Sequence, residues 1–318
     1  MPQPTASDLH VDQLLTQVSI GYKNSSYIAD QVLPIVEVLK RSDIVPQYDQ
    51  SHWFRDTAQP RAPGTIASGG GWTVDVTMKY YADRFSFKKE IDDDTRDNAD
   101  SQWALDVTAT NFVTDKLQLR REVAFATDFF TTGVWGSDKV GTVDFNQWSD
   151  YAISTPLIDI AGYVDSVEGL VAQEANTMVM GKQVWLQLKW HPDLIDTIKY
   201  TQRGQLSVEM FQSLVELSKV LVGRSLQTTS VEGTAEASVA YSRIWGKHVL
   251  LAFVAPTPSL MTPSAGYTFV WNRVPNAIQY IKRIRAEERE VDIIEGNSYF
   301  DQKLTAKGAG VFLQNAVA

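Results

Sequence analysis

The sequence predicts an α+β protein in which one long helix is flanked by extended segments and by one compact α+β segment. Residues 97–131 contain neither proline nor glycine, and their apolar residues recur at steps of three and four, which is the period of a helix. Residues 72–80 instead alternate apolar and polar side chains, which is the period of a strand. Short apolar runs and helical patterns follow each other between residues 155 and 265. Together these patterns favour mixed helix and sheet over an all-helical or all-strand chain.

The first 50 residues show no long amphipathic period and are typical of a terminal arm. Residues 28–32 predict a short helical turn that ends before Pro34, because proline disfavours helix in the residue before it. Residues 35–39 form a short apolar run, and residues 42–48 are expected to be extended. The alternative to an arm is an edge strand with loops.

Residues 51–91 predict a long β-hairpin. Its first strand is expected at 51–57, its tip is the Pro/Gly-rich stretch 58–71, and its second strand is 72–80. Phe85 and Phe87 continue an extended segment beyond it. Because an isolated hairpin is only marginally stable in water, we expect another chain to cover its apolar face.

The long helix predicted at 97–131 would span roughly 50 Å at 1.5 Å per residue. It is either the core helix of an ordinary domain or a spine for an extended subunit. The expected buried stripe consists of Leu105, Ala109, Phe112, Leu119, Val123, Ala126 and Phe130, widened by Val113, Leu117 and Ala124. The acids at its start, Asp92, Asp93, Asp94, Asp97 and Asp100, are expected to cap the helix and to interact with its dipole.

The remaining chain predicts shorter elements. Helices are expected at 157–172, 182–189, 192–200 and 207–218, and strands at 177–180, 219–222, 267–271 and 311–313. Residues 244–254 are expected to form a pair of strands or one strand bent around Gly246. The loop 224–242 is polar. Residues 277–295 form a ribbon, extended or partly helical, that is rich in both charge signs. Solvated charge is its simplest interpretation, and pairing across subunit boundaries is the alternative.

The composition excludes several classes of function. The chain has 318 residues, a net charge of −9 and no cysteine. Disulfides, zinc thiolates, iron–sulfur clusters and thiol nucleophiles are therefore excluded. The negative charge argues against strong nucleic-acid binding, which needs clustered lysine and arginine. No apolar run approaches the roughly 18–20 residues of a membrane span, and residues 1–15 lack the pattern of a signal peptide, so we expect synthesis in the cytoplasm.

The sequence offers no persuasive catalytic, cofactor-binding or metal residues, and we predict none. The four histidines (His10, His52, His191 and His248) have no metal-binding spacing. The acids Asp92–Asp97 could bind a divalent cation, but helix capping explains them more simply. A metal-dependent hydrolase that uses these acids is kept as an alternative. The triple glycine at 69–71 leads into a strand and lacks a following Lys-Ser/Thr, so it is not a phosphate loop.

The order of these parts resembles the major capsid protein of tailed bacteriophages, the Hong Kong 97-type (Johnson) fold. Several short stretches of the amino-acid sequence are also similar to that family, and the resemblance covers nearly the whole chain. The similar stretches are residues 28–34 (IADQVLP), 62–72, 176–185, the Trp190-His191-Pro192 run, Ile244-Trp245-Gly246, and Gly266-Tyr267-Thr268-Phe269 with Trp271. Each stretch alone is weakly specific, and their order carries the resemblance.

The resemblance implies a division into four parts. Residues 1–50 would be the N-terminal arm, and 51–91 the extended loop that lies over a neighbouring subunit. Residues 92–154 and 266–300 would form the peripheral domain with its spine helix. Residues 155–265 and 301–318 would form the axial domain around fivefold and sixfold axes. Lys79, Lys88 and Lys89 flank the hairpin, but no partner asparagine matches, so no isopeptide crosslink is predicted.

The implied function is a structural subunit, not an enzyme, that self-assembles into pentamers and hexamers of an icosahedral shell around double-stranded DNA. The expected partners are other copies of the chain, with scaffolding, portal and decoration proteins, and DNA only through weak contacts. We expect no membrane contact and no fused scaffolding segment before the arm. The implied location is the virion capsid, assembled in the host cytoplasm. A ring-forming tail or adaptor protein of the same virus is the other alternative.

Overall fold

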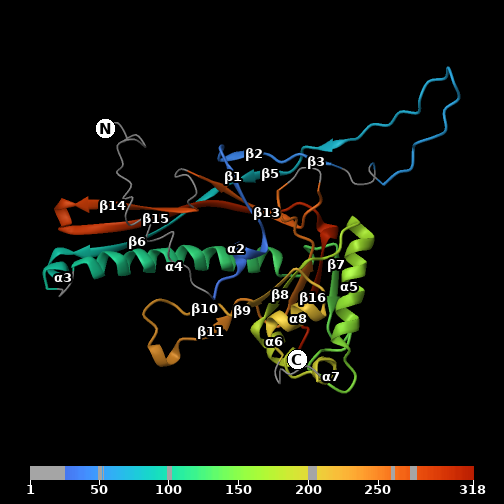
Figure 1. Cartoon of the computed structure of the whole chain (residues 1–318). Helices are drawn as coiled ribbons and strands as arrows, with labels where there is room; N and C mark the ends of the chain where they lie inside the picture. The colour runs from blue at the N-terminus through green and yellow to red at the C-terminus, as the bar shows by residue number, and fades with distance from the viewer. Residues whose placement is uncertain are drawn as a thin grey trace.

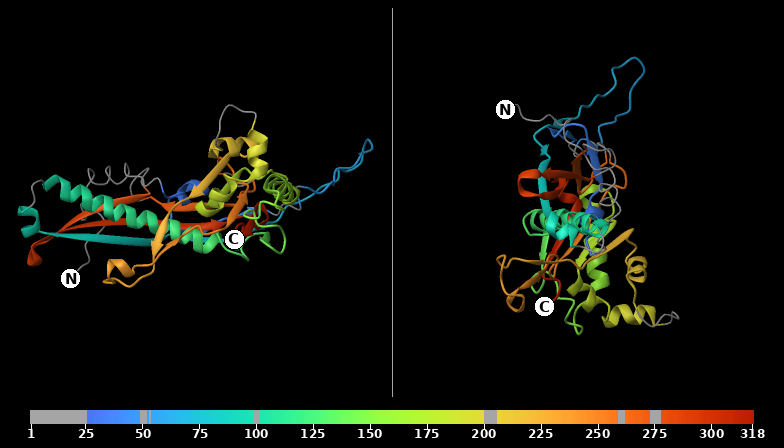
Figure 2. Two further views of the ribbon diagram at one scale, coloured as in Figure 1. Left: turned by 90° about the horizontal axis from the view of Figure 1, so that it is seen from below. Right: turned by 90° about the vertical axis from the view of Figure 1, so that its left-hand side faces the viewer.

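The protein is elongated, with a long helix lying along one sheet and a compact part built on a second sheet (Figure 1). The computed structural model describes residues 26–48, 52, 54–98, 102–199, 206–258, 262–272 and 278–318. A thin loop projects beyond both sheets, and a second view shows the same extended outline (Figure 2). The predicted α+β class is therefore confirmed. The N-terminal part of the expected arm, residues 1–25, lies outside the described residues.

The first sheet is organised around its longest strand, β15. Its strands are β1 (Ile35–Val38), β13 (Gly266–Trp271), β15 (Val291–Leu304), β14 (Gln279–Ala286) and β6 (Asp83–Asp92). Strand β15 pairs antiparallel with β13, β14 and β6, and β1 pairs parallel with β13. The charged ribbon is thus a β-hairpin, β14–β15, with a single 3₁₀ turn, η4 (Glu287–Arg289), at its tip.

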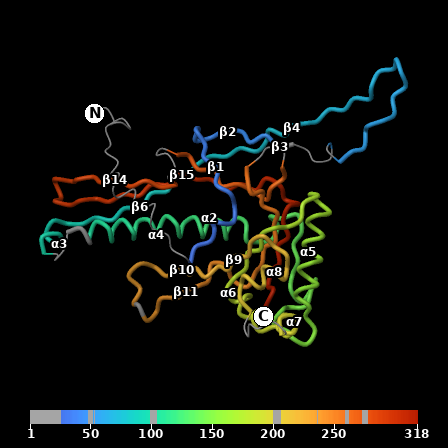
Figure 3. The backbone as a smooth tube through the Cα atoms, viewed as in Figure 1, coloured from blue at the N-terminus to red at the C-terminus, as the bar shows by residue number. Residues whose placement is uncertain are grey.

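The predicted spine helix is present but starts later than expected. Helix α4 runs from Gln102 to Phe129 and packs along β15 and β6 (Figure 3). Of the acids upstream, Asp93, Asp94 and Asp97 belong to a separate short helix, α3 (Asp93–Asp97), and Asp100 lies outside the described residues. The Asp92 carboxylate accepts a hydrogen bond from the Thr95 backbone N–H at 2.9 Å, so it caps α3 and not the long helix.

The buried face of α4 differs from the predicted stripe, and the expectation for Phe112 is wrong. Phe112 is 45% exposed, whereas its neighbour Val113 is fully buried at 0%. The buried face also carries polar residues: Thr110, Thr114, Arg121 and Glu122. Ala109, Val113 and Leu117 of the predicted stripe are buried, so the prediction is correct there. The buried polar residues interrupt the apolar period, and for that reason hydrophobicity alone located the buried face only in part.

The second sheet has the order β7-β16-β12-β8-β9. Its strands are β7 (Ser137–Val140), β16 (Gly310–Gln314), β12 (Val249–Ala252), β8 (Thr177–Gly181) and β9 (Lys219–Gly223). The helices around it are α5 (Pro156–Val171), α6 (Lys182–Leu188), α7 (Pro192–Ile198) and α8 (Val208–Leu214). Every residue of β8 and β12 is buried, which fits central strands covered on both faces. Among the described helices, none is long and apolar enough to cross a membrane.

Smaller elements connect these parts. They are α2 (Ala29–Val32), a hairpin of β10 (Leu226–Thr228) and β11 (Tyr241–Arg243), and the 3₁₀ turns η3 (Glu236–Ser238) and η5 (Lys307–Ala309). The predicted turn at 28–32 is confirmed. The polar loop 224–242 contains the unpredicted β10–β11 hairpin. Within the predicted strand region 244–254, only β12 (Val249–Ala252) is a strand, because Gly246 adopts a positive φ of 50° in the turn before it.

The extended loop is anchored by different strands from those predicted. Its base pairs β2 (Ser42–Ile44) with β5 (Lys79–Tyr81), and β3 (Gln47–Tyr48) with β4 (Val74–Asp75). The expected first strand at 51–57 is wrong, because residues 54–57 have no regular structure. The ascending strand lies in the segment that we had assigned to the arm.

Candidate subunit interface

The extended loop has no core within its own chain. All residues from 54 to 77 are exposed, and the segment projects away from both sheets (Figure 1). Ile66, near its tip, is 96% exposed, and Trp72 is 62% exposed. Large apolar side chains held in water are unfavourable, and their presence on a projecting segment indicates a contact surface.

The base of the loop is held firmly against the first sheet. The Tyr80 ring stacks on Phe269 with centroids 4.7 Å apart, and the Tyr80 hydroxyl donates to the Lys40 carbonyl at 3.1 Å. The Tyr81 backbone N–H donates to the Asp301 carboxylate at 2.8 Å. Burial raises the pKa of Asp301, and this hydrogen bond opposes that rise. A fixed base aims the exposed tip in one direction, which lowers the entropy cost of docking.

The root of the arm is clamped to the long helix by two consecutive side chains. Arg121 forms a bidentate pair with Asp30 of α2, with Nε–Oδ1 2.9 Å and Nη2–Oδ2 2.8 Å. The next residue, Glu122, accepts from the backbone N–H groups of Ile28 at 3.0 Å and Ala29 at 2.7 Å. The described part of the arm therefore leaves α4 in a defined direction.

Glu122 also ties the long helix to the compact part. Its Oε1 accepts from Trp245 Nε1 at 2.6 Å and from Ser225 Oγ at 2.9 Å. Burial raises the pKa of Glu122, and four hydrogen bonds to its carboxylate limit that rise. Four donors converge on one carboxylate at the point where the arm, the spine helix and the second sheet meet. Glu122 was not predicted as a functional residue, because a lone glutamate inside a helix carries no local signal.

The residues considered for chemistry have structural roles. Asp92 caps α3, and Asp93 pairs with Arg285 at 2.6 Å. Among the described residues, no group of three or more histidine and acidic side chains is placed to hold a metal ion. The hydrolase alternative at Asp92–Asp97 thus gains no geometric support. His10 lies outside the described residues, and His52 lies 3.2 Å from the Thr73 hydroxyl on the exposed loop.

A Ser-His-Asp grouping exists, but its hydrogen bonds oppose nucleophilic catalysis. His191 Nε2 lies 2.9 Å from Ser154 Oγ, and that hydroxyl donates to the Asp150 carbonyl at 2.6 Å. His191 Nδ1 accepts from the Asp193 backbone N–H at 3.3 Å, so Nε2 carries the proton in the neutral ring. A general base would need a free Nε2 lone pair toward the serine. His191 instead caps α7, as its place before Pro192 predicted, and burial lowers its pKa.

The curated proteins to which this sequence is similar include two phage major capsid proteins. No family model matches the sequence. The major capsid protein of Burkholderia phage BcepMu is 24% identical over 318 residues, covering 95% of each chain. That of Pseudomonas phage JBD67 is 26% identical over 326 residues, covering 97% of each chain.

Solved structures agree with these relatives. A phage-related protein from Bordetella bronchiseptica matches with a TM-score of 0.75 at 19% identity, covering 97% of this chain and 98% of that one. The capsid structure of cyanophage P-SCSP1u matches with a TM-score of 0.55 at 12% identity, covering 99% and 92%. The chain has the fold of a phage capsid subunit. The resemblance to tailed-phage major capsid proteins is confirmed, and the chain is a structural capsid subunit.

The charged ribbon of the capsid subunit is largely neutralised within its own chain. Arg283 pairs with Asp292 at 2.8 Å, and Arg96 bridges Asp292 at 3.0 Å and Asp106 at 2.8 Å. Arg285 pairs with Asp93. Simple solvation therefore does not account for these charges, and pairing with a neighbouring subunit stays a prediction. Its ion pairs join β14–β15 to α3 and to the start of α4.

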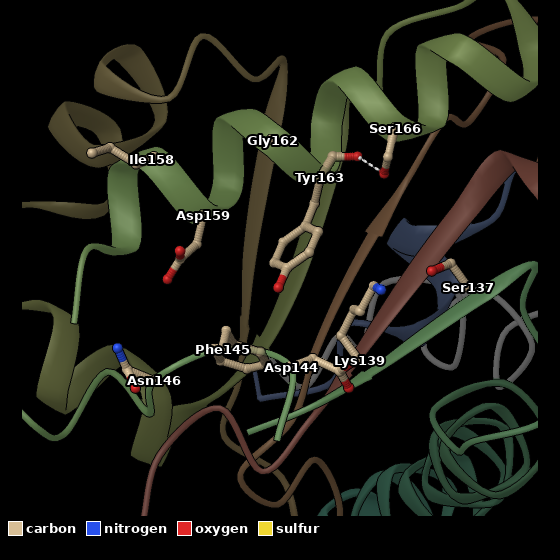
Figure 4. A pocket seen from close by; sticks show the side chains of 10 residues that line it. All are labelled: Ser137, Lys139, Asp144, Phe145, Asn146, Ile158, Asp159, Gly162, Tyr163 and Ser166. Atoms are coloured by element: carbon tan, nitrogen blue, oxygen red, sulfur yellow. Dashed lines mark hydrogen bonds between the residues drawn. The ribbon is translucent and has the colours of Figure 1, made fainter. Parts of the chain in front are cut away.

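A surface groove of about 610 Å³ lies between α5 and the edge strand β7 (Figure 4). It is lined by Ser137, Lys139, Asp144, Phe145, Asn146, Ile158, Asp159, Gly162, Tyr163 and Ser166. Both carboxylates have structural partners: Asp144 accepts from the Val140 N–H at 2.7 Å, and Asp159 accepts from Trp148 Nε1 at 3.0 Å. Burial and these two carboxylates raise the pKa of Tyr163 to about 12, so its phenol stays protonated. The groove holds no activated nucleophile.

Proposed function

We propose that this capsid subunit assembles into pentamers and hexamers of an icosahedral shell that encloses viral double-stranded DNA, and that it acts structurally and not as an enzyme. The part built on the second sheet would be the axial domain at the fivefold and sixfold axes. The long helix and the first sheet would be the peripheral domain. Because β7 pairs with β16, we assign 137–154 to the axial part and not to the peripheral part as the sequence suggested.

The extended loop carries this proposal. It offers exposed apolar side chains on a fixed base, and one buried large apolar side chain is worth about 1.5–3 kcal/mol. A neighbouring copy that covers the loop would supply this burial for every subunit. Such head-to-tail contacts close into rings when the rotation between copies closes. The arm, clamped through Arg121 and Glu122, would add a second contact of the same kind.

Further partners follow from the same role. We propose that scaffolding, portal and decoration proteins bind the assembled shell, and that assembly takes place in the host cytoplasm before the subunit resides in the virion. The net charge of −9 favours only weak, non-specific contact with the packaged DNA.

Deletion of residues 58–71 tests the proposal. We expect the variant to remain a folded monomer by circular dichroism and to form no particles by light scattering and negative-stain microscopy. Ile66→Ser should also slow particle formation, whereas Ile66→Leu, which keeps the apolar area, should not. Loss of folding on deletion would contradict the assignment. A wild-type chain that stays monomeric at high concentration would refute the function, and open tubes would favour the tail-protein alternative.

A further inference from the structure

One side of the second sheet carries a cluster of cations without acidic partners. Lys182 begins α6, Arg224 directly follows β9, and Arg243 ends β11. Burial lowers the pKa of Lys182, and the positive charges of Arg224, Lys189 and Arg243 lower it further. Within the described ranges, no carboxylate lies within ion-pair distance of Lys182, Arg224 or Arg243. These charges repel one another in the isolated chain, which indicates an anionic partner outside it.

Exposed apolar side chains surround this cluster. Leu226 and Tyr241 on the β10–β11 hairpin and Leu186 on α6 are all exposed. Arg224 and Arg243 are exposed as well. We call Lys182, Arg224 and Arg243, with these three apolar residues, the basic edge. Aromatic and aliphatic side chains beside arginine are the usual composition of a protein–protein contact.

Helix α5 presents the opposite charge on another side of the same sheet. Asp165 and Glu168 on α5 are exposed, and so is Glu174 just after it. In the part of the chain that the structure describes, no cation forms an ion pair with any of these three. Ile158, which is 71% exposed, lies on the same side of this helix, seven residues before Asp165. We call these four residues the acidic face.

The two surfaces lie far apart on the compact part. Helix α5 packs against β12 and β16, whereas α6 packs against β8 and β9. The β10–β11 hairpin points away from α5 in Figure 1. The basic edge and the acidic face therefore cannot neutralise each other within one copy. Two complementary patches on different sides of one subunit are the requirement for a head-to-tail contact.

We propose that the basic edge of one copy docks on the acidic face of α5 in the next copy, and that this contact closes the ring of the capsomer. The inference rests on the proposed capsid function and names the surfaces through which the ring forms. Exposed Ile158 would be covered by Leu226 and Tyr241, while the charges set the register and steer the encounter.

A second copy fits better than DNA as the occupant of the basic edge. The chain has a net charge of −9, and a groove for nucleic acid needs a longer run of cations. The complementary charge is already present, on Asp165 and Glu168 of α5 and on Glu174 just after it. Phosphates would also leave the exposed apolar side chains of both surfaces uncovered.

Charge reversal on the full-length chain tests the proposal. The first variant, Arg224→Glu with Arg243→Glu, is acidic on both surfaces; the second, Asp165→Lys with Glu168→Lys, is basic on both. We expect each to stay folded and to assemble about tenfold or more slowly than the wild type, by light scattering and analytical ultracentrifugation. The control reversal is Glu288→Lys, at the exposed tip of the β14–β15 hairpin at the far end of the molecule, and it should leave ring formation unchanged.

Recombination of the charges gives the sharper result. The fourfold variant with both surfaces reversed should recover assembly. An equal mixture of the two double variants should also associate, but only into rings with an even number of copies, because each contact then joins one copy of each kind. Normal assembly of either double variant, or failure of the fourfold variant to recover, would overturn the proposal.

Two other outcomes are distinguishable. If the first variant assembles normally but loses binding to a short DNA duplex in fluorescence anisotropy, the basic edge is a nucleic-acid site and the proposal is refuted. If the wild type itself does not assemble, the proposed capsid function fails first.

Discussion

Replacing Gly296 with alanine probes the contact between the spine helix and the first sheet. Gly296 lies in β15, opposite α4, and a Cβ atom there would lie 2.4 Å from Val113 Cγ1 and 2.9 Å from Leu117 Cδ1. Both distances are shorter than any relaxed carbon–carbon contact. Val113 has a stiff, β-branched side chain, so its methyl group cannot move aside without moving the helix.

The magnitude follows from packing. Overpacking a dense core costs about 1–3 kcal/mol. The alanine also reduces the freedom of the unfolded chain, which returns about 0.5–1 kcal/mol. We therefore expect Gly296→Ala to lower the free energy of unfolding by about 1–2 kcal/mol. Val113→Ala removes two buried methyl groups and should cost about 2 kcal/mol.

Combining the two substitutions isolates the contact. In the double variant, the new Cβ at 296 occupies space that Val113 Cγ1 has left, so the two effects should not add. We expect the double variant to be more stable than the sum predicts by about 1 kcal/mol or more. The assay is urea unfolding of the unassembled chain, followed by tryptophan fluorescence. The matched control is Gly162→Ala on α5, where a Cβ meets nothing within 4 Å, and which should stabilise by about 1 kcal/mol.

Two results would refute this reasoning. A neutral Gly296→Ala would mean that α4 does not lie this close to β15 in solution. Strict additivity in the double variant would mean that the Val113 side chain does not limit how closely α4 approaches β15 at Gly296.

Three further predictions concern the long helix, the arm root and pH. Val113→Asp should cost several kcal/mol in urea unfolding, because it buries an unpaired charge, whereas Phe112→Asp at an exposed site should change stability by less than about 1 kcal/mol; equal effects would contradict the assigned helix face. Glu122→Gln places an amide N–H₂ among four donors, so it should cost about 2–3 kcal/mol and expose residues 26–48 to faster proteolysis; an unchanged cleavage rate would argue against the clamp. Burial lowers the pKa of His191 in the folded protein below its value in the unfolded chain, which is about 6.5. The stabilising contribution of the neutral ring is therefore complete above about pH 6.5 and is lost as the pH falls through the lower pKa of the folded state. The urea midpoint should fall over that range, and it should fall less steeply in His191→Asn, which keeps a helix cap.

The elements with strong local signals were predictable from the sequence. Pro192 after His191 marked the start of α7, and Pro34 marked the end of α2. The absence of proline and glycine from 97–131 predicted the long helix. These signals are local because proline and glycine act on the backbone where they stand. They gave the order of the parts, and that order carried the resemblance.

Features that depend on partners distant in the sequence were not predictable. The loop base needed the pairing of 42–48 with 74–81, and nothing in the composition of 51–57 excluded a strand there. Glu122 became a junction only because Ile28, Ser225 and Trp245 converge on it from three separate segments. The charges of the ribbon gave no indication that Asp106 on the helix would neutralise them.

The sequence by itself determined the class of the fold and the existence of a long helix between extended segments. It also excluded every site that needs a cysteine. The tertiary structure decided which face of that helix is buried, because Val113 faces Gly296 while Phe112, one residue earlier, points toward solvent. A helix places neighbouring residues about 100° apart, so its rotation depends on the surface that it meets. Much of that surface is built by β15, nearly 200 residues away in the sequence, so the local periodicity of the helix carries no information about it.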